Sequence, residues 1–261
     1  KWKWEEIPVR LLCYMMTVWI TCYFVGIRQV DAEQPHIVFL IAEREYQTEK
    51  TLPDFCKQYV RDGKSSFVYA DPHEPNKLIG SEVVNTADLL FVSVRRRTLP
   101  PQQLNRIRQY VQAGKPVIGI RTASHAFCLR KQEPEDGFAA WPEFDSTVFG
   151  GNYTNHYKNS LVATIQKLTP ASAVAESLLS GIKELPCTSG GSLYCVSPLE
   201  EEADVVLEGV VEGHAPEPVA WTFRRADGGK SFYTSLGHID DFRGPVLPHL
   251  LSNAIEWCLR D

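Results

Sequence analysis

The residues with the clearest catalytic potential follow the last predicted strand of the chain. Residues 231–236 (Ser-Phe-Tyr-Thr-Ser-Leu) predict a strand, and His238 and Asp240 come shortly after it. A carboxylate two residues from a histidine can orient the imidazole and keep it basic, as general acid–base catalysis requires. The pattern predicts His238 as the acid–base catalyst and Asp240 as the residue that orients it. A capping interaction in the turn before residues 242–245 is the alternative.

Two glutamates, Glu43 and Glu45, follow the first predicted strand, residues 36–42. Like charges held close together raise the pKa of one carboxyl group when the pair is partly buried. We therefore expect Glu43 to be a second catalytic acid or base. An ion pair with Arg121 or with the arginines of residues 95–97 is the alternative.

Arg121 occupies a position where many α/β enzymes carry a nucleophile. Residues 116–120 predict a buried strand that breaks into a helix at Thr122, and such a turn lifts one side chain to the top of the sheet. An arginine is not deprotonated in proteins and is no nucleophile, so Arg121 is predicted to hold an anionic or keto oxygen. Ser124 lacks the flanking glycines of a serine nucleophile, and a triad with His238 and Asp240 is not expected.

Four further side chains are predicted to contact a ligand: Tyr46, His125, Tyr153 and His156. Tyr153 and His156 lie in a glycine-containing turn, residues 149–156, that could fold over a crevice, where Tyr153 or Trp141 could stack on a sugar ring. An ordinary loop with a buried tyrosine is the alternative.

No cofactor and no metal are expected. The turn after the first strand, residues 43–47, is charged and bulky rather than glycine-rich, which excludes a Rossmann or P-loop phosphate site. Histidines are good metal ligands, so metal-dependent hydrolysis through His125, His156 and His238 is an alternative. Their spacing does not match a paired ligand motif.

The elements that must position these residues alternate between strand and helix. Apolar runs predict strands at residues 36–42, 66–70, 89–94, 116–120 and 231–236. Helices are predicted from Thr48, its cap, to Gly63, after Pro100 as far as Gly114, and over residues 247–259. Weaker strand signals cover residues 161–165, 205–211 and 218–223, some of them antiparallel at an edge. This order predicts a three-layer α/β sandwich with a flavodoxin-like, mostly parallel sheet, which binds ligands at the carboxyl ends of its strands.

The N-terminal segment differs from the rest. Residues 11–26 carry no charge but are fewer than the ~20 residues that span a bilayer, and small residues precede a possible cleavage point after Ala32. We expect residues 1–32 to be a signal peptide, or an uncleaved anchor that would give the only membrane contact, and residues 33–261 to form a single domain. The protein is then exported, to the periplasm, the cell surface or the medium.

Composition narrows the range of partners. The 261 residues carry a formal net charge of -5, which argues against nucleic acid. Five cysteines follow residue 32, and Cys187 and Cys195 could form a disulfide or be unrelated. The odd number leaves at least one thiol free unless chains pair, and a homo-oligomer is among the partners that the sequence allows.

Residues 36–259 resemble the trehalose-utilisation (ThuA-like) family, a branch of the class I glutamine amidotransferase-like fold. The matching segments are residues 39–46, 119–123, 148–153 with His156, 232–238 and 253–257. Amidotransferases carry Gly-Ile-Cys-x-Gly at the turn and His-x-Glu after a late strand. This chain has Arg121 at the cysteine position, and His238 and Asp240 at the His-x-Glu position, so glutamine hydrolysis is not expected.

The resemblance implies a role in the utilisation of trehalose or a related disaccharide, with a small-molecule carbohydrate as the partner. One expectation is an exported enzyme that acts on a sugar derivative in a crevice at the carboxyl ends of the strands. The other is a non-catalytic carbohydrate-binding or scaffold module on the same fold. Since fold does not fix function, the resemblance alone does not choose between them.

Overall fold

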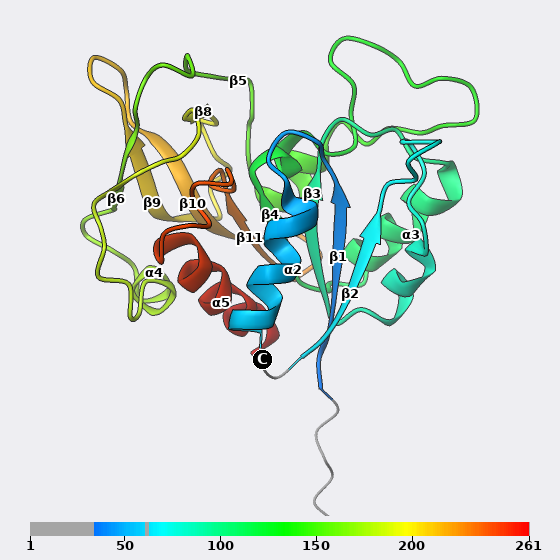
Figure 1. Ribbon diagram of the computed structural model, residues 1–261, viewed down its shortest axis with the longest axis horizontal. Helices are drawn as coiled ribbons and strands as arrows, with labels where there is room; N and C mark the ends of the chain where they lie inside the picture. The colour runs from blue at the N-terminus through cyan, green and yellow to red at the C-terminus, as the bar shows by residue number, and fades with distance from the viewer. Residues whose placement is uncertain (1–33, 61–62, 261) are drawn as a thin grey trace, which may run out of the picture. The chain divides into compact units, whose positions relative to one another are not determined.

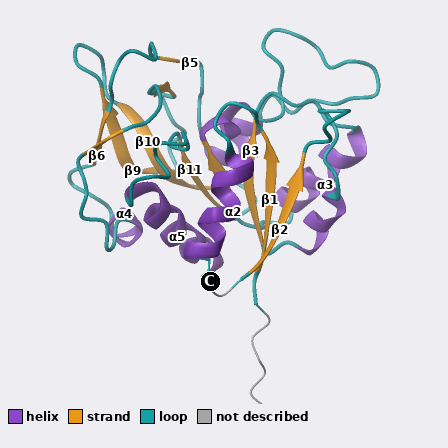
Figure 2. Ribbon diagram, in the orientation of Figure 1, coloured by secondary structure: helices purple, strands orange, loops and turns teal. Residues whose placement is uncertain are grey.

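The computed structural model describes residues 34–60 and 63–260, and the predicted signal peptide lies outside them. Nine strands form one sheet in the order β2-β1-β3-β4-β11-β10-β9-β6-β7 (Figures 1 and 2). Its strands are β1 (His36–Ala42), β2 (Lys64–Tyr69), β3 (Leu89–Val94), β4 (Val117–Ile120), β6 (Thr164–Lys167), β7 (Cys187–Thr188), β9 (Ala203–Val210), β10 (Glu217–Arg224) and β11 (Lys230–Thr234). A separate pair joins β5 (Asn155–His156) to β8 (Tyr194–Cys195).

The sheet has a parallel part and an antiparallel part. Strands β2, β1, β3, β4 and β11 pair in parallel, and β11, β10, β9, β6 and β7 pair antiparallel. Every residue of β1 and β3 is buried, as expected for continuous apolar runs covered on both faces. The predicted α/β sandwich with a mostly parallel sheet is therefore confirmed, including its antiparallel edge.

Helices cover both faces of the sheet and give it three layers (Figure 2). Ile37, Phe39 and Ile41 of β1 share a core with α2 (Thr48–Tyr59), α4 (Ala173–Leu178) and α5 (Val246–Leu259). The alternate residues Val38, Leu40 and Ala42 share the opposite core with α3 (Pro101–Gln112) and the short helix η1 (Ser81–Thr86). The two-residue period of the strand thus assigns its side chains to the two cores.

Three local predictions need correction. Thr48 is not the cap of α2: Gln47 occupies that position in the left-handed conformation, and Thr48 is the first helical residue. The helix ends at Tyr59 rather than Gly63. The chain after β4 forms only a short 3₁₀ helix, η2 (Arg121–His125), instead of a longer α-helix.

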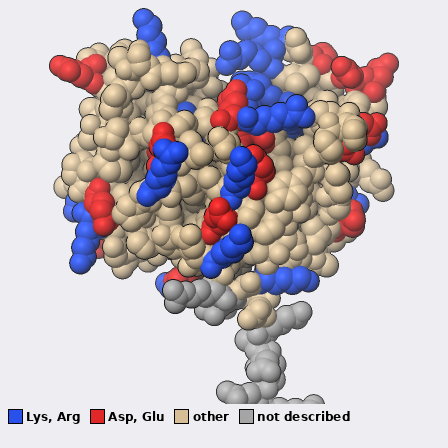
Figure 3. Space-filling view, viewed as in Figure 1, with Lys and Arg blue, Asp and Glu red and all other residues tan. Residues whose placement is uncertain are grey.

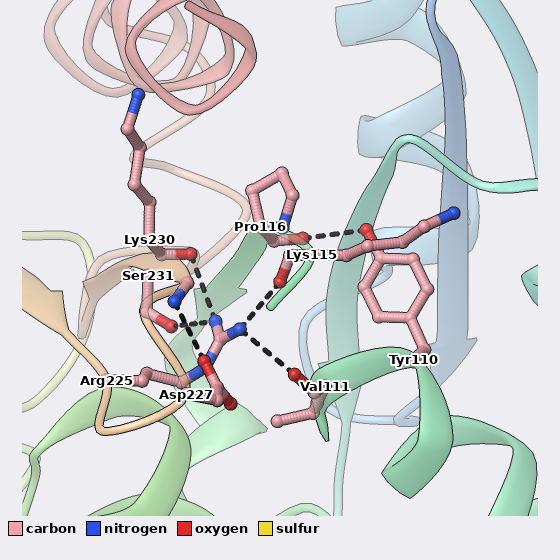
Figure 4. A network of polar contacts seen from close by, with 9 residues as sticks. Tyr110, Val111, Lys115, Pro116, Arg225, Asp227, Lys230 and Ser231 are labelled. Atoms are coloured by element: carbon pink, nitrogen blue, oxygen red, sulfur yellow. Dashed lines mark hydrogen bonds and ion pairs between the residues drawn. The ribbon is translucent and has the colours of Figure 1, made fainter. Parts of the chain in front are cut away.

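A buried arginine fastens the amino end of β4 to the β10–β11 hairpin (Figure 4). Arg225 is 4% exposed, and its guanidinium donates to the carbonyls of Val111, Lys115 and Lys230 at 3.3, 2.8 and 3.1 Å. Its Nε pairs with Asp227 at 3.1 Å. This network lies at the edge of the sheet opposite to the carboxyl ends, so it holds the scaffold and not the predicted site.

The cysteines of the described residues are all free, and Cys187 and Cys195 form no disulfide. The two residues lie in different sheets, Cys187 in β7 and Cys195 in β8. Within residues 34–60 and 63–260, no helix is both long and apolar enough to cross a membrane.

Candidate functional site

A pocket of about 310 Å³ opens at the carboxyl edge of the parallel strands. We call it the arginine–tyrosine pocket, and its lining consists of Glu45, Tyr46, Arg95, Arg96, His125, Arg130, Tyr153, His156 and Tyr194. The loops after β1 and β3, helix η2, the turn before β5, and strands β5 and β8 all contribute. Four residues predicted to contact a ligand, Tyr46, His125, Tyr153 and His156, are thus brought together from distant parts of the chain.

The charges of this pocket are predominantly positive. Arg95 forms an ion pair with Glu45 at 2.9 Å, whereas Arg96 and Arg130 form none with any carboxylate among the described residues. Figure 3 shows lysine and arginine side chains gathered at the top of the molecule, above the carboxyl ends of β1 and β3. The local charge is opposite in sign to the net charge of the chain.

His125 is a neutral histidine in a positive setting. Its side chain is buried, stacks on the ring of Tyr153 with centroids 4.4 Å apart, and places Nδ1 3.1 Å from the Ser124 hydroxyl. Burial, and then the charges of the four arginines nearby, lower the pKa of His125 to about 2. The ring therefore serves as a hydrogen-bonding and stacking group near neutral pH rather than as a base.

Arg121 lies beneath the arginine–tyrosine pocket and does not line it. It is 3% exposed, and its Nη1 donates to the carbonyls of Ser192 and Ser235, each at 2.9 Å. The guanidinium carbon lies 4.9 Å from the ring centre of Tyr46 and 4.3 Å from that of Tyr194. Arg121 therefore supports two walls of the pocket through carbonyl and cation–π contacts, and it does not present its charge directly to a ligand.

The sharp turn predicted at residue 121 is present. Arg121 has a φ of 47°, in the left-handed region that a non-glycine residue adopts at some energetic cost. Its carbonyl accepts a hydrogen bond from the Tyr233 hydroxyl at 2.5 Å, which fixes the turn to the neighbouring strand β11.

His238 and Asp240 lie beside the pocket, behind Tyr46. The Nδ1 of His238 is 3.4 Å from an Asp240 carboxylate oxygen and accepts from the Asp240 amide at 3.2 Å. The imidazole meets the Tyr46 ring edge-on, with centroids 5.8 Å apart. Asp240 also pairs with Arg243, and the amide of His238 donates to Asp241. The residues make both the predicted contact and the alternative turn contacts, outside the lining of the pocket.

Glu43 faces the backbone instead of the pocket. Its carboxylate accepts from the amides of Glu45, Tyr46 and Thr48 at 2.6, 2.8 and 2.9 Å, and from the Thr48 hydroxyl at 2.6 Å. The alternative ion pair with Arg121 or residues 95–97 is not formed in the described chain. The geometry gives Glu43 a capping role at the start of α2, because four donors already occupy its oxygens.

Three residues of the site were missed by sequence reasoning: Arg130, Tyr194 and Asp145. Asp145 begins the short π-helix η3 (Asp145–Phe149), is 8% exposed, and accepts from the Tyr153 amide at 2.8 Å. Its other oxygen has no hydrogen-bond partner among the described residues, and burial raises the pKa of Asp145 to about 7. Only the neighbouring glycines, Gly150 and Gly151, marked this region in the sequence.

Asp145 lines a second pocket, of about 270 Å³, which we call the aspartate pocket. The two pockets share Arg96, His125, Arg130 and Tyr153, so they meet around one group of side chains. Among residues 34–60 and 63–260, no group of three histidine, cysteine or acidic side chains could hold a metal ion.

A larger cavity, of about 570 Å³, lies at the opposite end of the parallel strands. Its lining includes Ile37, Tyr59, Gly63 and His249. Parallel sheets bind ligands at the carboxyl ends of their strands, so the position of the arginine–tyrosine pocket makes it the better candidate despite its smaller volume.

Comparison with known proteins gives one family and several solved structures. The family model described as "ThuA: Trehalose utilisation" matches residues 29–258. None of the curated proteins compared with the chain matches it.

Two solved proteins described as ThuA-like resemble the chain at 14% sequence identity. The protein from Bacteroides uniformis has a TM-score of 0.58, over 89% of this chain and 95% of its own. The protein from Parabacteroides merdae has a TM-score of 0.59, over 87% and 90%. A protein described as part of a GMP synthase, from Thermoplasma acidophilum, has a TM-score of 0.49 at 11% identity, over 85% and 96%. At these identities the two ThuA-like structures show a shared fold.

Proposed function

The chain belongs to the ThuA family, described as trehalose utilisation, and we propose that it serves carbohydrate utilisation by binding a sugar or sugar derivative in the arginine–tyrosine pocket. The ligand is a small-molecule carbohydrate, trehalose or a related disaccharide or its derivative. A nucleic acid is not proposed, because the chain has a net charge of -5.

One observation carries this proposal: three tyrosines, two histidines and three arginines converge on a single pocket at the carboxyl edge of the sheet. The apolar face of a sugar ring can pack on tyrosine, while its hydroxyl groups bond to arginine and histidine. Pockets that combine aromatic walls with a few fixed polar groups are typical sites for small molecules. His125 and Tyr153 stack on each other, so this part of the wall is already ordered.

Glutaminase activity is not part of the proposal. Amidotransferase chemistry of this fold needs a thiolate at the turn after the central strand, and residue 121 is an arginine. Its guanidinium is buried against Ser192, Ser235 and two tyrosine rings. No nucleophile therefore occupies this position.

Export is proposed from the N-terminal sequence alone. Residues 11–26 are uncharged and are followed by the possible cleavage point after Ala32, as expected of a signal peptide. Attachment to a membrane is proposed only for a chain that retains this segment.

Binding without catalysis is the second candidate, and the site geometry favours it. The only carboxylate that lines the arginine–tyrosine pocket, Glu45, is paired with Arg95, and the low pKa of His125 makes it a poor base. Glu43 is a capping residue and His238 lies behind Tyr46. The predicted catalytic pair, His238 with Asp240, would be reached only past the Tyr46 ring.

Calorimetric titration of the purified protein with trehalose, other disaccharides and sugar acids tests the binding proposal. We expect saturable binding to at least one sugar, and Tyr153→Ala should weaken it about tenfold through loss of a stacking wall. The control is Tyr69→Ala, which removes a partly exposed tyrosine from β2, outside the pocket. Absence of binding to every sugar, or an equal effect of both substitutions, would contradict the proposal.

Incubation of each bound sugar with the protein, followed by product analysis, separates an enzyme from a binding module. If His238 is the acid–base catalyst, His238→Ala abolishes turnover and leaves the melting temperature nearly unchanged. No product from the unaltered protein after prolonged incubation supports the binding module. Turnover that survives His238→Ala excludes this histidine as the catalyst.

A further inference from the structure

We infer that the sugar derivative carries an anionic group, a carboxylate or a phosphoryl group, which Arg96 and Arg130 bind where the arginine–tyrosine pocket meets the aspartate pocket. The sugar part of this inference rests on the proposed function. The anionic part rests on the charges and geometry of the two pockets.

The position of the two arginines defines where the anion lies. Arg96 follows β3 and Arg130 lies in the loop after η2, yet both line both pockets. Tyr153 and His125 are the other residues common to the two. An anion between the arginines would therefore sit beside an aromatic wall that can hold the rest of the ligand.

The charge balance leaves both arginines available. Glu45 neutralises Arg95, while no carboxylate of the described residues forms an ion pair with Arg96 or Arg130. Arg121 adds a further positive charge beneath the pocket. The depressed pKa of His125, which these arginines help to lower, agrees with a strongly positive local potential.

Asp145 is the one other carboxylate beside the shared residues, and it does not cancel their charge. It lines the aspartate pocket, accepts only the Tyr153 amide, and is buried. Burial raises its pKa to about 7, so a large fraction of Asp145 is protonated near neutral pH. A protonated carboxyl group does not repel an anion and can donate a hydrogen bond to it.

The backbone holds Arg96 in an uncommon conformation. Its φ is 48°, in the left-handed region, and its amide donates to the carbonyl of His125 at 3.0 Å. The next residue, Arg97, donates its amide to Ala126 at 2.7 Å and its Nε to Ala42 at 3.1 Å. Backbone strain fixed by surrounding bonds is concentrated at binding and catalytic sites. The strained backbone of Arg96 is thus a second observation at a residue whose guanidinium forms no ion pair among the described residues.

The guanidinium group suits this ligand chemistry. Its planar fork donates two parallel hydrogen bonds to a carboxylate or a phosphoryl group, and two such groups can surround one anion. The sugar ring would then extend toward Tyr46, Tyr153 and Tyr194. A neutral sugar would leave both guanidinium charges unmatched.

Calorimetry of the full chain with four probes tests the inference: glucose, glucuronate, glucose 6-phosphate and inorganic phosphate. We expect at least one charged sugar to bind about tenfold or more tightly than glucose, with affinity that falls as salt increases. If glucuronate binds more tightly than glucose 6-phosphate, the anion is a carboxylate; if glucose 6-phosphate binds more tightly, it is a phosphoryl group.

Arg96→Gln and Arg130→Gln should each weaken binding of the charged sugar about tenfold or more, a larger loss than either causes for glucose. Arg224→Gln is the matched control, because it removes an exposed arginine of β10 from outside both pockets. Arg130 lies in an exposed loop, so its variant tests the inference even if Arg96→Gln perturbs the strained turn.

The remaining outcomes distinguish the inferred anion site from the proposed sugar function. Equal binding of glucose and the charged sugars, unaffected by Arg96→Gln and Arg130→Gln, overturns the inference and leaves the proposed function standing. Binding of phosphate that depends on both arginines, with no sugar bound here or in the disaccharide titration, supports the anion site and overturns the sugar function. No binding of any of the four probes overturns the inference, and the proposed function falls with it only if the disaccharide titration is also negative.

Discussion

Two buried arginines, Arg121 and Arg225, show how this chain places a guanidinium out of contact with water. Arg225 pairs with Asp227 and donates to three backbone carbonyls, so its charge and its hydrogen bonds are both matched. Arg121 has no carboxylate partner among the described residues and relies on two carbonyls and two aromatic faces. Arg121 is therefore a structural member of the site, and its removal should affect stability before chemistry.

Substitution Arg121→Met should lower the free energy of unfolding by about 2–4 kcal/mol, because the carbonyls of Ser192 and Ser235 lose their donor inside the protein. Urea denaturation measures this loss. The control Arg95→Met removes a half-exposed arginine and should cost no more than about 1 kcal/mol. Equal costs for the two would show that the buried contacts of Arg121 contribute little.

Asp145 makes stability depend on pH. Its pKa of about 7 exceeds the ordinary value of 3.8, so the folded chain binds the proton more tightly than the unfolded chain. The free energy of unfolding therefore falls as the pH rises from about 4 to about 7, in total by something on the order of 2–4 kcal/mol.

Asp145→Asn should remove that fall and make the protein more stable than the unaltered chain at pH 8. The amide oxygen can still accept from Tyr153, so the contact that orders the turn is kept. Thermal unfolding between pH 4 and 8 measures the effect. Parallel curves for the two proteins would contradict a raised pKa at Asp145.

The structure brings together those predicted side chains that directly follow a strand or a nearby turn. Tyr46 and His125 line one pocket because the carboxyl ends of parallel strands share one edge of the sheet. Arg130 lies in the long connection after η2 and Tyr194 in the two-residue strand β8, and the positions of both depend on packing across the whole domain. Asp145 could not be identified from the sequence, because its burial, and not its residue type, makes it unusual.

At the scale of elements, apolar runs located the strands well, but they did not give the extent of the helix after β4. That chain forms only the short helix η2. At Gly119 of β4, an added Cβ would overlap the ring of Phe149 from η3. Phe149 thus lies against the strand at a point where other residues would carry a side chain.

Gly119→Ala should lower the free energy of unfolding by about 1–3 kcal/mol, because the Phe149 ring must move within a filled core. Gly244→Ala is the matched control: no atom lies within 4 Å of its added Cβ, and a change within about 0.5 kcal/mol is expected. Urea denaturation of both variants makes the comparison. A cost for Gly119→Ala no larger than that of the control would mean that η3 adjusts freely.

At the scale of the whole molecule, the chain order of the strands differs from their order in the sheet. The parallel part ends at β11, the last strand described, which pairs in parallel with β4 and antiparallel with β10 and so joins the two parts. The apolar pattern of β11 predicted a strand but could not show that it lies at the centre, because that position depends on pairing with both β4 and β10. The pairing and register of β11 with strands far away in the sequence cannot be predicted from a local apolar pattern.

A chain that ends at residue 228, without β11 and α5, should therefore fail to fold cooperatively. It would expose the edges of β4 and β10 and lose one side of the core that contains Leu250 and Phe232. Circular dichroism with thermal unfolding is the measurement. A sharp transition close to that of the full chain would show that the two parts of the sheet fold independently.

The central position of β11 also sets an order of events during synthesis on the ribosome. The first four strands of the sheet emerge early, but the apolar edge of β4 stays open until residues 230–234 follow. Ser235, which holds the Arg121 guanidinium, emerges only after them. Nascent chains would thus display an open apolar strand edge from the synthesis of β4 until that of β11, so holdase chaperones should associate with them until β11 inserts.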